Sequence, residues 1–264
     1  MGAAWLRLYR LDSVPPGWRD DEVVETTVHA ALIRQGHWVL FFPQAEGHEP
    51  LYHYLSAAWI TVAGQSLFIV RMLSVFLGLL SVAALYRLAR GWFGAPVALV
   101  AAAGLAASFW SLMYSRFKLR QVGTVAPMLL AFHFFFRAFR AKASPRARWR
   151  DALLAALCLS VSLYTYYAAR AIPFIWLALA VYLLVYHRAA MRDRWRPLAL
   201  MAGVTLALAA PLAIAIALTP QSQARLSVVG APLADLLRGD PSYVLRNAAQ
   251  TLAMPAFTGD PEYL

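Results

Sequence analysis

Residues 66–88 read SLFIVRMLSVFLGLLSVAALYRL, in which Arg71 is the only charged residue before Arg87 near the end. A helix of about 20 apolar residues is long enough to cross the hydrocarbon core of a bilayer, and arginines near its ends can reach the interface. This stretch is therefore predicted to be a membrane-spanning helix.

The rest of the chain repeats this pattern. The 264-residue sequence is 61% hydrophobic and 14% charged, against roughly 45–50% and about 25% in soluble domains. This composition excludes an ordinary soluble enzyme and a disordered chain, and we expect an all-α polytopic membrane protein. Runs without charges predict about six spanning helices, at 66–88, 95–114, 120–139, 151–169, 171–188 and 197–218.

Two shorter helices are expected to lie at the membrane surface, at residues 22–35 and 49–63. The second carries Tyr52, Tyr54 and Trp59, and such aromatic residues are typical of the headgroup level. The chain is thus predicted to consist of an outer loop with surface helices, a spanning region and the start of a further outer segment, at residues 12–65, 66–218 and 219–264 respectively.

Loop charges predict the orientation. Twelve Lys and Arg residues lie in loops 87–94, 137–150 and 188–196, whereas the short loops on the opposite side carry four. The first set is predicted to be cytoplasmic, and the net charge of +11 is attributed to these loops, with no nucleic-acid partner. Eleven of the 13 acidic residues then fall outside, and chemistry on the outer face is one explanation for this bias.

Three consecutive carboxylates, Asp20-Asp21-Glu22, follow a Pro-Pro-Gly turn in the outer loop. A carboxylate at an outer interface is suited to act as general base on an acceptor hydroxyl. The alternative is that Asp20 caps the helix at 22–35 and the other acids favour its positive first turn. Glu25 and His29 follow at i, i+4 spacing, which fits either interpretation.

His48 and Glu49, with Glu46, precede Pro50 and are candidates to hold a divalent cation or a sugar hydroxyl. The alternative is a Pro that simply opens the next helix. No pair here has zinc-like helical spacing with a third ligand, so the metal requirement stays open. The single cysteine, Cys158, excludes a disulfide within the chain and a thiolate cluster.

Arginines in the outer turns form a third candidate group. Arg116 and Arg120 oppose the charge rule on that side, and a phosphate at headgroup depth would satisfy them through bidentate hydrogen bonds. Arg71 is an ionisable residue inside an apolar helix, and Arg170 is a similar case after an aromatic run. Pairing with protein acids or with ordinary lipid headgroups is the alternative for these side chains.

Taken in order, these segments resemble the membrane glycosyltransferases of glycosyltransferase family 39, which include protein O-mannosyltransferases and lipid A aminoarabinose transferases. The resemblance is carried by the Asp21-Glu22 pair, by the His48-Glu49-Pro50-Leu51 segment, by the GQSLFIVRMLSVFLG stretch at 64–78, and by the outer turns Tyr114-Ser115-Arg116 and YTYYAARAIP at 164–173. The aminoarabinose transferases have Lys-Pro-Pro-Leu where this chain has His-Glu-Pro-Leu. The chain resembles the N-terminal part of such an enzyme.

The resemblance implies transfer of a sugar from a polyprenyl-phosphate-linked donor, outside the cytoplasm, to a lipid, glycan or protein acceptor. Asp21 carries over as the catalytic carboxylate and Glu22 as its companion. We expect Arg71, Arg116, Arg120, His48, Glu49 and Arg170 to bind the substrate. The rival hypotheses are a transporter or flippase of a lipid-linked sugar, and a structural subunit of a larger membrane assembly. The expected location is the cell membrane, with the active site facing the periplasm or exterior.

Overall fold

A computed structural model describes residues 1–44, 47–140, 144–219 and 224–253, and the side chains of 224–229 are also outside the description. Glu46, Lys142 and the end of the predicted outer segment 219–264 lie outside the described residues. The regular structure within these ranges is helical, with one isolated bridge between Phe42 and His48. The prediction of an all-α polytopic membrane protein is confirmed.

The segment predicted to be an outer loop, residues 12–65, contains the short helices that sequence patterns predicted. After α1 (Gly2–Leu8), the first predicted surface helix is present as three consecutive elements, α2 (Asp20–Val23), the π-helix η1 (Val24–His29) and α3 (Ala30–Arg34). The second is α4 (Leu51–Ala63). The wider turns of a π-helix change which side chains share a face, and such turns are frequent at functional sites.

Within the part of the chain that the structure describes, four segments are long and apolar enough to cross a membrane. They are α5 (Leu67–Phe93), α8 (Val122–Phe139), Tyr167–Tyr186, which joins the 3-10 turn η2 (Tyr167–Ala171) to α10 (Ile172–Tyr186), and α11 (Arg188–Ala217). A fifth crossing is formed if α6 (Ala95–Ala107) and α7 (Phe109–Arg116) count as one span, although they meet at an angle of 56°.

The structure therefore differs from the six predicted spans. The predicted span 151–169 corresponds to α9 (Pro145–Leu163), a 19-residue helix with four charged residues in its first two turns, Arg146, Arg148, Arg150 and Asp151. The prediction that residues 188–196 form a loop is also wrong, because α11 already begins at Arg188. In both cases the helix continues through a basic segment, since charged residues at a helix end are compatible with helical backbone.

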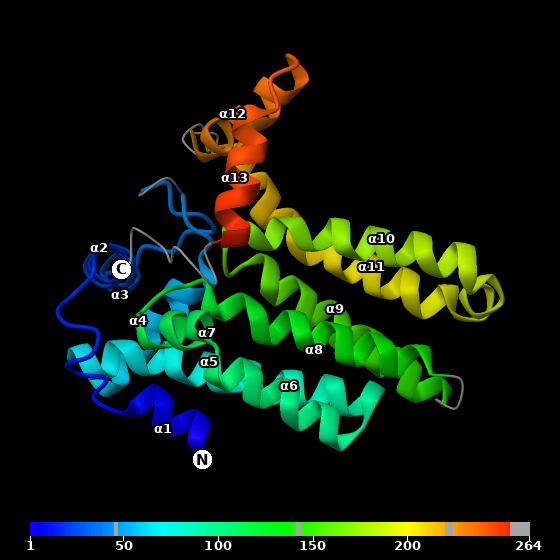
Figure 1. Ribbon diagram of the computed structural model, residues 1–264, viewed down its shortest axis with the longest axis horizontal. Helices are drawn as coiled ribbons and strands as arrows, with labels where there is room; N and C mark the ends of the chain where they lie inside the picture. Colours follow the sequence, from blue (N-terminus) through cyan, green and yellow to red (C-terminus); the bar gives the residue numbers. More distant parts are fainter. Residues whose placement is uncertain (45–46, 141–143, 220–223, 254–264) are drawn as a thin grey trace. The chain divides into compact units, whose positions relative to one another are not determined.

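Helices α5, α6, α8 and α9 run alongside one another, with contacts between α5 and α6, α5 and α8, and α8 and α9 (Figure 1). Close packing of α5 against α7 depends on Gly78, because a Cβ atom added there would lie 2.5 Å from Ser115 Cβ. The α8–α9 pair is tied at one end by the buried Asp151, whose carboxylate contacts Arg137 and Arg150, both at 3.1 Å.

The chain divides into two compact units. The first comprises Met1–Phe42 and His48–Ala215 and contains α1 to α10, most of α11 and the predicted catalytic and substrate-binding residues. The second comprises Pro43–Gly47 and Ile216–Leu264, in which α12 (Ala224–Leu237) contacts α13 (Ser242–Ala253).

Candidate active site

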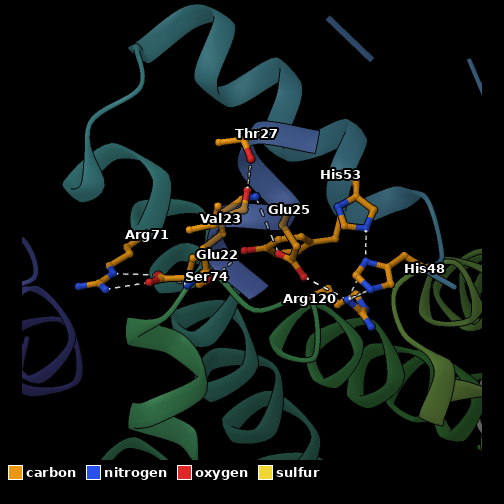
Figure 2. Close-up of polar contacts among 11 residues, drawn as sticks. Glu22, Val23, Glu25, Thr27, His48, His53, Arg71, Ser74 and Arg120 are labelled. Atoms are coloured by element: carbon orange, nitrogen blue, oxygen red, sulfur yellow. Dashed lines mark hydrogen bonds and ion pairs between the residues drawn. The ribbon is translucent and has the colours of Figure 1, made fainter. Parts of the chain in front are cut away.

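Glu22 is held in place by a buried bidentate ion pair with Arg71 (Figure 2). Arg71 donates from Nε to Glu22 Oε1 and from Nη2 to Oε2, both at 2.9 Å. The backbone N–H groups of Arg19 and Lys118 donate to the same carboxylate at 3.2 and 2.8 Å. Arg71 also donates to the backbone carbonyls of Leu11, Pro15 and Gly17. This pair fastens the start of the outer loop to α5.

Asp21, the residue before Glu22 on α2, is partly exposed, and its charge acts on the nearby Glu25. Asp20 is exposed. The expectation that Asp20 caps the helix is wrong, because α2 begins at Asp20 and the residue at the N-cap position is Arg19, whose N–H is satisfied by Glu22. The three acids do occupy the first turn, where the helix dipole favours negative charge.

Glu25 lies one turn beyond Asp21, in a fully buried cluster with two cations. Its carboxylate lies 3.3 Å from Arg120 Nη1 and 3.8 Å from Lys118 Nζ. Burial raises the pKa of Glu25 to about 7, against the lowering effect of Lys118 and Arg120. Burial likewise lowers the pKa of Lys118 to about 8. Among the described residues, neither Lys118 Nζ nor Glu25 Oε2 has a hydrogen-bond partner.

His48 lies on the other side of Arg120. Arg120 Nη1 is 2.7 Å from each ring nitrogen of His48, and His48 Nδ1 is 3.2 Å from His53 Nε2 (Figure 2). His29, at the end of η1, packs against both imidazoles. Burial, followed by the charges of Arg120 and Lys118, lowers the pKa of His29 to about 4, and burial also lowers the pKa of His53. The imidazoles of His29 and His53 are therefore neutral at pH 7.

The two remaining predicted arginines, Arg170 and Arg116, are partly exposed to solvent. Arg170 donates to the buried Glu49 at 2.7 Å, keeps 29% of its side chain exposed and lies over the Tyr167 ring. Arg116 donates to the carbonyls of Leu6, Tyr9 and Val14. Glu49 and Arg170 thus join the segment before α4 to η2, and Arg116 joins α7 to the segment around α1.

A cavity of about 540 Å³ lies among α5, α6, α7, α8 and η2–α10. Its lining is mostly apolar, and the aromatic residues in it are Trp110, Tyr114 and Tyr166. Three predicted site arginines are close in sequence to lining residues: Arg120 precedes Gln121, Arg170 lies between Ala169 and Ala171, and Arg116 follows Tyr114 by two positions. Arg71 has no such neighbour in the lining.

The structure brings together residues that the sequence patterns did not single out as a site. Glu25 and His29 were noted only for their helical spacing, and Lys118 and His53 had no assigned role. The signal for Lys118 was present, because it alternates with Arg116 and Arg120 on a side of the membrane where basic residues need partners. The sequence contained no comparable signal for His29, His48 and His53, because the intervals of 19 and 5 residues between them match no helical metal-binding motif.

Apolar helices long enough to span a membrane, together with a carboxylate-bearing segment before α5, define a polytopic membrane protein with a buried charged site. The chain matches the family "Dolichyl-phosphate-mannose-protein mannosyltransferase" over residues 47–214. It belongs to this family of membrane glycosyltransferases, as the resemblance to glycosyltransferase family 39 predicted. No curated protein matches the chain at a significant level.

Two solved structures share the fold. The chain is similar to ArnT from Cupriavidus metallidurans in the apo state, with a TM-score of 0.62 and 21% identity over 76% of this chain and 38% of that one. For ArnT bound to undecaprenyl phosphate the TM-score is 0.66, with 21% identity over 84% of this chain and 40% of that one. The chain thus spans about 40% of the length of these relatives.

Proposed function

We propose that this protein is an integral membrane glycosyltransferase that moves a sugar from a polyprenyl-phosphate-linked donor to a hydroxyl acceptor on the outer face of the membrane. The observation that carries the proposal is the apolar cavity with three arginines close to its lining in sequence. Membership of the glycosyltransferase family and the undecaprenyl phosphate bound to the structurally similar ArnT support the same donor class.

The cavity suits an amphiphilic donor. Its volume of about 540 Å³ lies within the range of roughly 300–1,000 Å³ that is common for ligand sites. Apolar walls match the first isoprene units of a polyprenyl chain. The lining also contains the hydroxyls of Ser108, Ser111 and Thr124, of which Ser111 already accepts from Arg7 and Thr124 is bonded to Thr165. A soluble sugar nucleotide would gain little from such walls, so the lining favours a lipid-linked donor.

The leaving group of this reaction is a lipid phosphate, whose developing negative charge must be met by fixed cations. Arg170 is the best placed, because it keeps exposed surface and is already oriented by Glu49. Arg116 is partly exposed but donates to three carbonyls, and Arg120 is almost fully buried. We propose that Arg170 and Arg116 contact the phosphate. Arg120 would add positive electrostatic potential from its buried position, without touching the phosphate.

The acceptor hydroxyl requires a base, and we assign this role to Asp21. Like Asp20 it has exposed surface on the first turn of α2, and the family resemblance favours Asp21 of the two. Glu22 is fully engaged by Arg71 and by two backbone N–H groups, which suits a residue that positions Asp21. Arg71 and Glu22 are therefore proposed to orient the catalytic loop, and Glu49 to orient Arg170.

Kinetics of the full-length enzyme in nanodiscs with a polyprenyl-phosphate sugar test this proposal. Loss of a charged hydrogen bond to phosphate costs about 1.5–3 kcal/mol, so Arg170→Ala and Arg116→Ala should each lower donor use by about 10- to 150-fold. The exposed Arg87 offers a matched control, because Arg87→Ala removes a guanidinium remote from the cavity lining. Unchanged donor kinetics in both site variants, or donor translocation without sugar release, would contradict the proposal.

A further inference from the structure

Three buried histidines meet in the first outer loop. His29 ends η1, His48 precedes α4 and His53 lies in the first turn of α4, and none has more than 1% of its surface exposed. One ring nitrogen from each can be chosen so that all three lie within 4.8 Å of one another. The ring centroids are 4.4 to 5.2 Å apart.

Three of the six ring nitrogens in this cluster, all of them on His29 and His53, have no hydrogen-bond partner among the described residues. Neither ring nitrogen of His29 has a hydrogen-bond partner among the described residues, and His53 Nδ1 has none either. A buried polar atom without a partner is costly, and native structures contain few of them. Phe42 closes the cluster on one side, with its ring 4.8 Å from His29 and 5.2 Å from His53. Packing alone does not account for three imidazoles here, since an apolar side chain would carry no such penalty.

We propose that His29, His48 and His53 form a binding site for a transition-metal ion of the zinc class, which ties η1 to α4. Three imidazole nitrogens are a common ligand set for Zn²⁺, with Zn–N distances of about 2.0–2.1 Å. In a tetrahedral site the ligand nitrogens are then about 3.4 Å apart. His48 Nδ1 and His53 Nε2 are already 3.2 Å apart, and one nitrogen from each of the three rings can be chosen within 4.8 Å of the others. Binding an ion would require the imidazoles to move closer together and His48 to release Arg120 from the nitrogen that it uses.

The electrostatic surroundings are mixed but compatible with a cation. Arg120 lies 2.7 Å from the His48 ring, and the positive charges of Arg120 and Lys118 act on His29 and His53 and oppose a further cation. Arg120 is itself paired with Glu25 at 3.3 Å, so its field at the histidines is reduced. The cluster is also placed between elements instead of within one, because η1 and α4 are in contact. A bound ion would therefore join η1, which continues from the helix that carries Asp21, to α4 and the segment before it.

Metal content and spectroscopy test the site without reference to sugar transfer. Full-length protein, purified without a histidine tag and stripped with a chelator, is titrated with Zn²⁺ and separately with Co²⁺. We expect about one equivalent of bound Zn²⁺ by elemental mass spectrometry and a tetrahedral Co²⁺ absorption spectrum. His29→Gln and His53→Gln should abolish both, whereas His37→Gln, at an exposed histidine, should change neither.

If the His29 and His53 variants fail to fold, measurements on the wild-type protein alone still test whether the metal site exists. Zn²⁺ should raise its thermal stability, and a chelator should reverse the gain. Less than about a tenth of an equivalent of Zn²⁺, with no Co²⁺ spectrum, would overturn the site, as would equal loss of metal in His37→Gln. An Asp21→Asn enzyme that is inactive yet still binds one Zn²⁺ would show that the metal site stands independently of the proposed transferase chemistry.

Discussion

Glu22 and Arg71 are 49 positions apart in the chain and form a bidentate ion pair from which solvent is excluded. Both side chains make further hydrogen bonds to the backbone, so each charge is compensated on several sides. The pair joins the first turn of α2 to the first turns of α5. It sets the position of Asp21, because Asp21 is the residue immediately before Glu22 on the same short helix.

Removing one partner of this pair should destabilise the protein strongly. An uncompensated buried charge costs about 3–5 kcal/mol, so Arg71→Met should unfold in detergent at a clearly lower temperature than wild type. Asp20→Asn is the control, since Asp20 is exposed on the same turn. The double variant Glu22→Gln, Arg71→Met should lose less stability than the two single losses added together. Additive losses would show that the two charges are not coupled.

Gly78 should be intolerant of any side chain. A Cβ at this position would come within 2.5 Å of Ser115 Cβ, and both α5 and α7 would have to separate. We expect Gly78→Ala to lower thermal stability by an amount typical of overpacking, about 1–3 kcal/mol. Gly104→Ala is the matched control in α6, because a Cβ there meets nothing within 4 Å. Equal stability of the two variants would disprove the close approach of α5 and α7.

Glu25 should make folding stability depend on pH. Its pKa is raised from 4.5 to about 7 in the folded protein, so between these values the folded state binds more protons than the unfolded state. Stability must then fall as pH rises through this window, by up to about 1.4 kcal/mol per pH unit. The Glu25→Gln variant lacks this pH-dependent contribution to the free energy of unfolding.

The measurement for Glu25 is the stability difference between wild type and Glu25→Gln. It should decrease as the pH rises from 4.5 to 7, while the contributions of His29 and His53 largely cancel because both proteins contain them. A difference that is constant over this range would place the pKa of Glu25 near its ordinary value and contradict the desolvated cluster.

The predicted orientation, with residues 12–65 on the outer side, rests on the excess of twelve basic residues in one set of loops over four in the other. In a Cys158→Ser background, Ser13→Cys and Arg146→Cys each place one cysteine at an exposed position on opposite predicted sides. A membrane-impermeant thiol reagent added to intact cells should label Ser13→Cys and spare Arg146→Cys until the cells are permeabilised. Equal labelling of both variants before permeabilisation would refute the predicted topology.

Hydrophobic runs were sufficient to predict the class of fold and most of its helices, because membrane spans are fixed by length and apolarity alone. They did not predict the bend between α6 and α7 or the continuation of α11 through its basic start, because neither changes the count of apolar residues. The surface helix at 22–35 was predicted from its pattern, whereas its π-helical centre, which helps to place Glu25 and His29, has no signature in residue type.

Within the site, the sequence identified single charged residues but not their partners. Glu22 and Arg71 were both expected to be functional, yet their pairing depends on how α5 packs against the start of the loop. The same holds for Glu49 with Arg170, which are 121 positions apart. Long-range contacts of this kind follow from tertiary packing and cannot be derived from local spacing.

The most direct test of the account concerns Asp21 as general base. Asp21→Asn keeps the size of the side chain and cannot accept a proton at neutral pH, so it isolates the chemical step. Sugar transfer by full-length enzyme in nanodiscs, from a polyprenyl-phosphate donor to its acceptor, should fall about 10²- to 10⁴-fold with unchanged thermal stability. Asp20→Asn should stay near wild type, and Glu22→Gln should lose activity together with stability. Wild-type turnover and pH dependence in Asp21→Asn would remove Asp21 from the mechanism and contradict the account.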